Sequence, residues 1–398
     1  MKAGWDWVSV GDFAKTGAGG TPLKGKSEFY DGGEIPWLLS GEVCQRDIFS
    51  TKNFITQDGL RGSSAKLFPA GSVLIAMYGA TAGQAGILRF EAATNQAVCA
   101  VLPNSRYVPE YLYYFLLLEK GNLVSQAVGN AQPNISQGKI RETLIPLPPL
   151  DEQKRIVAVL DAAFAGLSRA RAHTETNLQN ARELFESVLR VSAETDAAKF
   201  GTVTVAELAL EVTDGDHMPP PKAKTGIPFV TISDVRKDTR EIDFSNTFMV
   251  PERYFNDLKD KRRPRTGDIL YTVTGATLGI PILIKDDRPF CFQRHIGLVR
   301  PKALVNSEWL YFMMMSPYVF SQADGGATGA AQRTVSLSVL RGFTVPKIPL
   351  ERQTDLAASF RARWEASFTI AAHYRAKLAD LDALRQALLQ KAFAGELT

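Results

Sequence analysis

The densest group of side chains suited to binding chemistry is the segment KDKRRPR, residues 259–265. The planar fork of an arginine guanidinium matches phosphate oxygens and the guanine edge, so the segment is a candidate contact with nucleic acid. A solvated surface loop is the ordinary alternative for a run of charges. The cationic members are Lys259, Lys261, Arg262, Arg263 and Arg265.

Polar side chains that could read base edges lie beside apolar runs in both halves of the chain. Gln293, Arg294 and His295 follow one predicted strand, and Asn95 and Gln96 hold the matching place in the first half. Asn and Gln amides can pair bidentately with adenine, although a polar turn is the simpler interpretation of either residue alone. Weaker candidates in the first half are Gln45, Arg46, Lys66 and Tyr78.

Motifs of catalysis are missing from the sequence. It contains no Walker loop, no GxSxG, no HExxH and no DPPY-like or NPPY-like methyltransferase tetrapeptide. The segment GATAGQAG, starting at Gly79, lacks the GxGxxG spacing and is interpreted as a turn between strands. His173 and His373 are interpreted as residues of helix faces, and the three cysteines show no CxxC spacing. We therefore expect no catalytic residue, no metal site and no cofactor.

A repeat with an offset of about 200 residues organises the chain. The stretch IPLPPLDEQKRIVAVLDAAF, residues 145–164, returns in altered form as VPKIPLERQTDLAASF, residues 345–360. Upstream, IPWLLSGEV at 35–43 matches IPFVTISDV at 227–235, and NQAVCAVLP at 95–103 matches QRHIGLVRP at 293–301. The chain is therefore one unit written twice, with small insertions in its loops.

Each copy ends in a predicted long helix. Prolines are followed by an acidic residue that can cap, Asp151 or Glu351, and then by a proline-free stretch with apolar residues spaced by three and four. At 1.5 Å per residue such a helix runs on the order of 60 Å, and the other copy is the economical partner for its apolar stripe. The predicted coiled-coil positions are Ile156, Leu160, Leu167, Leu178, Leu184 and Val188 in the first helix, and Phe360, Trp364, Leu378, Leu381, Leu384 and Leu388 in the second.

These patterns predict a mixed α+β fold with two α/β domains, at residues 1–148 and 196–347, and two spacer helices, at 149–195 and 348–398. The hydrophobic content of 45% and charged content of 22% are ordinary for a globular protein. We expect a cytoplasmic location, because three widely spaced cysteines argue against a disulfide framework, and no membrane segment, because no apolar stretch approaches eighteen residues. The net charge of +4 is small for a chain that grips DNA alone, so a partner is expected to share the phosphate contacts.

The order of four motifs carries a family resemblance over essentially the whole chain. LPPLDEQKRIVAVLD, TDGDHMPP, GDILYTVTGATLG and the terminal LLQKAFAGEL together resemble the specificity subunits of type I restriction-modification systems. The resemblance implies two target-recognition domains, each reading one half of a split double-stranded DNA target, joined by two helices that pack antiparallel.

The resemblance also implies a subunit without catalytic activity. Adenine methylation from S-adenosylmethionine would belong to modification subunits, two of which would dock on the helices, and ATP-driven translocation and cleavage to restriction subunits. Three alternatives remain open at this point. The chain could serve a related system whose methyltransferase and nuclease are fused, or be a coiled-coil scaffold for two protein-binding modules, or be an autonomous methyltransferase. Salt-sensitive DNA binding and cofactor binding by the isolated chain discriminate among them.

Overall fold

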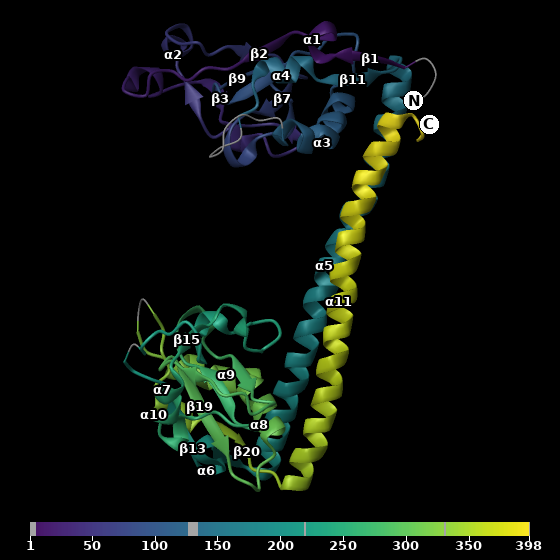
Figure 1. Ribbon diagram of the computed structural model, residues 1–398. Helices are drawn as coiled ribbons and strands as arrows, with labels where there is room; N and C mark the ends of the chain where they lie inside the picture. Colours follow the sequence, from purple (N-terminus) through teal and green to yellow (C-terminus); the bar gives the residue numbers. More distant parts are fainter. Residues whose placement is uncertain (1–4, 126–133, 219, 330–331, 398) are drawn as a thin grey trace. The chain divides into compact units, whose positions relative to one another are not determined.

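The computed structural model describes residues 5–125, 134–218, 220–329 and 332–397. The chain forms two compact units. Unit 1 comprises Met1–Thr174 with Ala376–Thr398, and unit 2 comprises Glu175–Arg375. Each unit therefore combines one α/β domain with part of each long helix (Figure 1). The division falls inside the two helices, whereas the predicted domain boundaries lie near the helix ends.

Unit 1 contains a five-stranded sheet with the order β2-β10-β7-β8-β4. Its strands are antiparallel except for β4, which runs parallel to β8. A smaller sheet has the order β5-β3-β9-β6, and β1 pairs with β11. The strands are β1 (Asp6–Ser9), β2 (Thr16–Ala18), β3 (Ile35–Leu38), β4 (Asp47–Ile48), β5 (Phe54–Ile55), β6 (Leu67–Phe68), β7 (Val73–Ala76), β8 (Ala85–Leu88), β9 (Ala92–Thr94), β10 (Val98–Val101) and β11 (Leu144–Leu147). The helices of this domain are α1 (Val10–Phe13), α2 (Gln57–Arg61), α3 (Pro109–Ser125) and α4 (Gln137–Glu142).

Unit 2 repeats this plan. Its larger sheet has the order β13-β19-β16-β17, its smaller sheet the order β15-β14-β18, and β12 pairs with β20. The strands are β12 (Thr202–Thr204), β13 (Ala209–Asp214), β14 (Ile227–Val230), β15 (Phe248–Val250), β16 (Ile269–Thr272), β17 (Pro281–Leu283), β18 (Cys291–Phe292), β19 (Ile296–Pro301) and β20 (Thr344–Pro346). The helices are α6 (Val205–Leu208), α7 (Glu252–Asn256), α8 (Ser307–Met315), α9 (Pro317–Gly326) and α10 (Leu337–Gly342). The predicted fold class and internal repeat are confirmed.

The central strands are apolar on both faces because each separates two cores. In β7, Val73 and Ile75 join the core beneath α3, while Leu74 and Ala76 join the core beneath the smaller sheet. Alternate residues of a strand point to opposite faces, so one continuous apolar run serves both cores. In unit 2, β16 does the same, with Tyr271 on the α8 side.

The long helices are α5 (Leu150–Phe200) and α11 (Leu350–Ala394), and they pair antiparallel within each unit. In unit 1, Arg171 Nη1 lies 2.6 Å from Asp382 Oδ1 and Arg385 lies over the Phe164 ring. In unit 2, the rings of Phe185 and Trp364 lie 5.1 Å apart, and Arg352 pairs with Asp196 at 2.5 Å. In both units residue numbers increase along α5 as those of the contacting residues on α11 decrease, so the helices run antiparallel.

Two predicted coiled-coil positions are wrong. Leu184 and Leu384 are 67% and 48% exposed, whereas Phe185 and Leu189 are buried. A straight helix of 3.6 residues per turn drifts away from a strict seven-residue repeat, so the buried stripe moves by one residue toward the α/β domain. Of the other predicted positions, Ile156, Leu160 and Phe360 are buried, and Leu167, Leu178, Val188, Trp364, Leu378, Leu381 and Leu388 are half-buried.

One buried glutamine in each copy attaches the α/β domain to its long helix. Gln153 of α5 accepts a hydrogen bond from the Val108 N–H at 2.9 Å and donates to the Pro148 carbonyl at 2.8 Å. Gln353 of α11 makes the equivalent bonds with the Asn306 N–H at 2.9 Å and the Ile348 carbonyl at 3.0 Å. This duplicated role explains why Gln recurs at the same place in DEQ and ERQ.

Candidate nucleic-acid interface

One end of each larger sheet carries a rim where four segments meet. In unit 2 we call residues 214–217, 273–277, 293–295 and 332–335 rim 2. The Val273 N–H donates to the His295 carbonyl at 2.9 Å, and the Val335 N–H donates to the Val273 carbonyl at 2.8 Å. The Gly275 N–H donates to the Arg333 carbonyl at 3.0 Å. The main chain thus fixes these loops to one another.

Unit 1 builds the same rim from equivalent segments. Rim 1 consists of residues 18–21, 77–81, 95–97 and 134–135. The Met77 N–H donates to the Ala97 carbonyl at 2.8 Å, the Ile135 N–H donates to the Met77 carbonyl at 2.9 Å, and Tyr78 forms a bridge with Asn134. The two rims therefore share a main-chain framework and differ in side chains.

A glycine in each rim permits close packing of the first segment on the strand turn. A Cβ atom on Gly19 would clash with the Thr94 carbonyl oxygen, and one on Gly215 would clash with the Phe292 carbonyl oxygen. The following residue is then held by an equivalent hydrogen bond, from the Gly20 N–H to Thr94 or from the Asp216 N–H to Phe292, each at 2.9 Å. Gly19 and Gly20 in unit 1, and Gly215 in unit 2, therefore hold the first segment of each rim against the strand turn.

Three of the predicted contacts in the first half lie in rim 1. Tyr78 is 36% exposed and Gln96 is exposed. The Asn95 side chain accepts a hydrogen bond from the Ala97 N–H at 3.2 Å, and Gln96 accepts one from the Thr21 hydroxyl. The amide of Asn95 therefore shapes the turn, while Gln96 and Tyr78 present polar atoms on its exposed side.

The remaining candidates of the first half lie outside rim 1. Gln45 and Lys66 are exposed. Arg46 is committed within the fold, since its Nη1 lies 2.6 Å from Asp161 Oδ1 of α5 and 3.1 Å from the Tyr114 hydroxyl of α3. This partnership, together with Asp47, keeps the pKa of Arg46 raised against the opposing effect of burial.

Gln293, Arg294 and His295 come together in rim 2, as their position after a predicted strand suggested. Arg294 is exposed, and the other two are half-buried. Burial and the neighbouring charge of Arg294 lower the pKa of His295. The His295 ring is thus biased toward its neutral form, which offers one hydrogen-bond donor and one acceptor.

The basic segment 259–265 lies against rim 2, and most of its charge is used inside unit 2. Arg262 pairs with Asp216 at 3.2 Å and with Asp214 at 3.4 Å, and the Tyr254 hydroxyl donates to Asp216 at 2.6 Å. Lys261 lies 3.8 Å from Glu211. The segment is therefore a buttress of the rim rather than a free patch of charge.

The other cations of this segment differ in their surroundings. Arg263 donates to the Asn256 carbonyl and stacks on Phe255, and Arg265 pairs with Asp260. Lys259 is exposed. A role in DNA contact stays a prediction for all of these residues.

Sequence reasoning did not select Asp214, Asp216 and His217, which form part of rim 2. His217 Nε2 lies 2.7 Å from Asp214 Oδ2. The signal was present in TDGDH, where two acids flank a glycine and precede a histidine, at the place occupied by AGG in the first half.

The described residues contain no group of three or more His, Cys, Asp and Glu side chains that could hold a metal ion. Burial raises the pKa of the Cys99 thiol to about 12, which opposes thiolate formation.

Across the described ranges, no helix combines the length and apolarity needed to cross a membrane. The chemistry on offer at the rims is hydrogen bonding by exposed polar side chains.

The family model that matches residues 2–175 is described as the type I restriction modification DNA specificity domain. The EcoR124I/EcoR124II specificity subunit of Escherichia coli is 30% identical over 161 residues, which cover 39% of this chain and 40% of that relative. The MjaVIII specificity subunit of Methanocaldococcus jannaschii is 22% identical over 375 residues, which cover 90% of this chain and 85% of that relative.

Similarity to a solved structure extends over the whole chain. A chain from work on complex assembly and conformational transition of the type I R-M system matches with a TM-score of 0.77 at 20% identity. The match covers 100% of this chain and 99% of that one. At 20% identity the match establishes a similar fold. The matched region includes both repeats and both long helices.

Proposed function

Because the chain belongs to the specificity subunits of type I restriction-modification enzymes, we propose that each of its two units reads one half of a split DNA target through its rim. This subunit class recognises DNA sequence and does not catalyse methylation or cleavage. The proposal assigns the base contacts to particular loops. Lysines and arginines would position each unit on phosphates, and a few rim side chains would read the major groove.

The observation that carries the proposal is that one main-chain framework is built twice with different side chains. The hydrogen bonds that join the loops of rim 1 recur in rim 2. The exposed residues differ, with Tyr78 and Gln96 in the first and Arg294 with His217 in the second. A pair of similar modules with different reading residues is what recognition of two unlike half-sites requires.

Partners are part of the proposal. Two modification subunits would dock on the long helices and adjacent faces, and restriction subunits would join this assembly. Most cations of segment 259–265 are engaged within unit 2. This supports the view that a partner shares the phosphate contacts. A cytoplasmic location follows from the DNA target.

The test is to co-express the chain with the modification subunit encoded beside it and to map methylated adenines on a plasmid by single-molecule sequencing. We expect a split motif. Exchange of residues 1–148 with those of another specificity subunit should change one half of the motif, and exchange of residues 200–345 should change the other. The half of the motif that changes with each exchange would show which unit recognises it.

Two outcomes would contradict the proposal. Methylation that is unchanged without this chain would show that it does not direct the modification subunit. Absence of methylation in an assembled complex supplied with cofactor, together with absence of salt-sensitive DNA binding, would favour a coiled-coil scaffold instead.

A further inference from the structure

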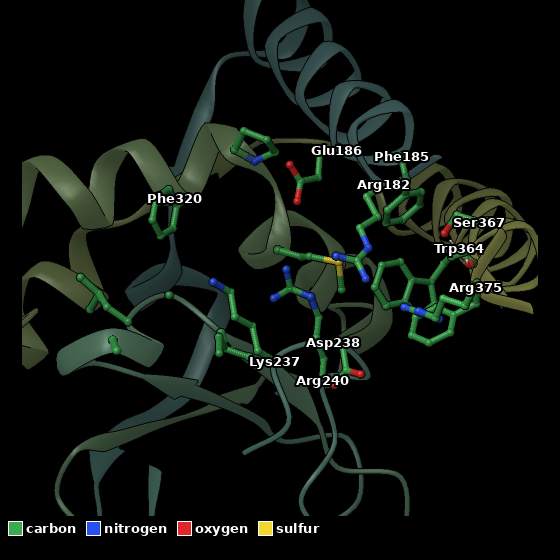
Figure 2. A pocket seen from close by; sticks show the side chains of 18 of the residues that line it. Arg182, Phe185, Glu186, Lys237, Asp238, Arg240, Phe320, Trp364, Ser367 and Arg375 are labelled. Atoms are coloured by element: carbon green, nitrogen blue, oxygen red, sulfur yellow. Dashed lines mark hydrogen bonds between the residues drawn. The ribbon is translucent and has the colours of Figure 1, made fainter. Parts of the chain in front are cut away.

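A cavity of about 830 Å³ lies in unit 2 between the α/β domain and the long helices. Figure 2 shows Arg182 of α5, Arg240 of the loop after β14, and Trp364 of α11 around this space. Four cationic side chains line it, Arg182, Lys237, Arg240 and Arg375, against two carboxylates, Glu186 and Asp238. The volume falls in the range of sites for small organic molecules.

Arg240 is the unusual member of this wall. Its Nη1 atom is buried and has no hydrogen-bond partner among the described residues. Its backbone has a φ of 56°, in the left-handed region, and no other non-glycine residue of the described chain has a positive φ. Burial lowers its pKa, opposed by Tyr311, Glu186 and Tyr271. A buried guanidinium without an acceptor is costly, so the arrangement is incomplete as it stands.

The internal repeat shows which acceptor is missing. Arg240-Glu241-Ile242 corresponds to Arg46-Asp47-Ile48. Ile48 packs with Leu88 in the core of unit 1, as Ile242 packs with Ile284 in unit 2. In unit 1 both terminal nitrogens of the arginine are bonded, Nη1 to the Asp161 carboxylate and the Tyr114 hydroxyl and Nη2 to the Asp161 carboxylate.

Both acceptors are lost in the second copy. The residue at the place of Tyr114 is Phe312, which has no hydroxyl, and the residue at the place of Asp161 is Arg361, which is itself a cation. Arg361 forms its own ion pair with Glu308 and offers no acceptor to Arg240. Phe312 and Arg361 line a second cavity, and Arg240 contributes to the walls of both cavities.

The walls of the cavity define what could replace the missing carboxylate. Arg182 points into the same space as Arg240, and neither forms an ion pair with another described residue (Figure 2). Trp364, Phe185 and Phe368 supply flat apolar surfaces beside these cations. An anionic group would satisfy the two guanidinium groups, and a planar apolar body attached to it would cover the rings.

We propose that this cavity is a binding site for an organic anion, whose carboxylate or phosphate supplies to Arg240 the acceptor that Asp161 supplies to Arg46 in unit 1, and whose apolar part covers the aromatic rings. The anion comes either from a free small molecule or from the acidic side chain of an associated subunit. The site does not depend on the DNA-reading function, and the experiment on the assembled complex needs only association with the modification subunit.

The first experiment titrates the full chain with sodium benzoate and measures binding by calorimetry and the midpoint of thermal unfolding. Benzylamine, which has the same ring and the opposite charge, is the control ligand. We expect saturable benzoate binding with a rise in Tm and no binding of benzylamine. Arg240→Asn tolerates the left-handed backbone and removes the charge, so affinity should fall by about tenfold to a hundredfold.

Two further variants separate binding from folding. Arg46→Asn removes the equivalent cation of unit 1, and it should lower stability while leaving benzoate affinity unchanged. The double variant Phe312→Tyr with Arg361→Asp restores the internal acceptors of unit 1. Lys285 corresponds to Arg89, which pairs with Asp47 and Glu110 in unit 1; Lys285 pairs with Glu241 at 3.6 Å and lines the same cavity as Glu308, so it is the cation available to Glu308 once Arg361 is replaced. This variant should fold and lose benzoate binding.

The assembled complex with the modification subunit distinguishes the two sources. Benzoate binding that disappears on assembly would assign the anion to the partner, and binding that persists would assign it to a free ligand. Binding by Arg240→Asn or by the restored double variant that equals wild-type binding would overturn the site, as would equal binding of benzylamine. None of these results depends on whether DNA recognition succeeds.

Discussion

Rim 1 and rim 2 have the same main-chain framework but are held by different forces. In rim 2, Asp214 and Asp216 are pinned by Arg262. At the corresponding places rim 1 has Ala18 and Gly20, and Gly20 packs directly against the main chain of Ser64 and Ala65. One rim is fixed by ion pairs and the other by close backbone contact.

This difference explains why a run of charges is a poor guide to a binding surface. Lys66 occupies the place in unit 1 that Arg262 occupies in unit 2, and Lys66 is exposed. The lysine is free to meet a ligand, whereas the arginine is engaged with acids of its own rim. Lys66 is therefore a better candidate than Arg262 for direct contact with DNA.

The largest effect is expected where the rims are alike. Gly19→Ala and Gly215→Ala each place a Cβ atom inside van der Waals contact of a carbonyl oxygen. Each should lower the free energy of unfolding by about 2–3 kcal/mol, because the strand turn must move. Urea denaturation of the two variants checks this, and each should also weaken recognition of its own half-site only.

Gly41→Ala is the matched control for that pair. Nothing lies within 4 Å of an added Cβ at Gly41, and its φ is not in the left-handed region. Stability equal to that of wild type is expected for it. If Gly19→Ala or Gly215→Ala behaved like this control, the close approach would not define the rims.

An intermediate effect should expose the difference between the rims. Arg262→Ala leaves Asp214 and Asp216, whose side chains are 15% and 14% exposed, without their cation. We expect a loss of about 1–2 kcal/mol in unfolding free energy for Arg262→Ala and less than about 0.5 kcal/mol for Lys66→Ala. For DNA binding we expect the opposite order. Lys66→Ala should lower the affinity for DNA and the salt dependence of that affinity, although the protein stays fully stable.

Denaturation and DNA titration of both variants in the assembled complex provide the measurement. Equal stability losses for the two would remove the distinction between an ion-paired and an open rim. The combined change of Arg262, Arg263 and Arg265 to Ala should weaken recognition of one half-site, through loss of the buttress as well as of any direct contact.

The smallest effect concerns the charge of rim 2. Arg294→Gln removes a positive charge beside His295, so protonation of the ring becomes easier and the pKa of His295 should rise toward its ordinary value. Burial continues to lower that pKa, so recovery should be partial. With four histidines in the chain, NMR titration of the ring protons can follow it, and His295→Gln assigns the signal. An unchanged pKa would show that Arg294, whose Nε lies 3.4 Å from His295 Nε2, does not govern protonation of the ring.

Much of the architecture could be predicted because it depends on periodicity and repetition. The alternation of buried residues in β7 and the long proline-free helices leave clear marks in a sequence, and each copy supports the interpretation of the other. The coiled-coil seam was less predictable. Leu184 fits an ideal heptad, but Phe185 contacts both Trp364 and Phe312, and this contact with the domain determines which residue is buried.

The candidate site could be predicted only in part. The strand turns that carry Asn95 and Gln293 were recognisable, because polar residues interrupt apolar runs there. The engagement of Arg46 with Asp161 joins residues 115 positions apart, and no local pattern announces it. The loss of that partnership at Arg240 becomes visible only when the equivalent residues of both copies are placed in space.

The paired glutamines also bear on how such a protein can evolve. Gln153 and Gln353 hold their domains through main-chain N–H and carbonyl groups alone. Because these hydrogen bonds use only main-chain groups, they do not depend on which side chains the attached domain carries. A gene that acquires a different domain by recombination at the proline-rich junction can therefore keep a working joint, and a new specificity can arise in one genetic event.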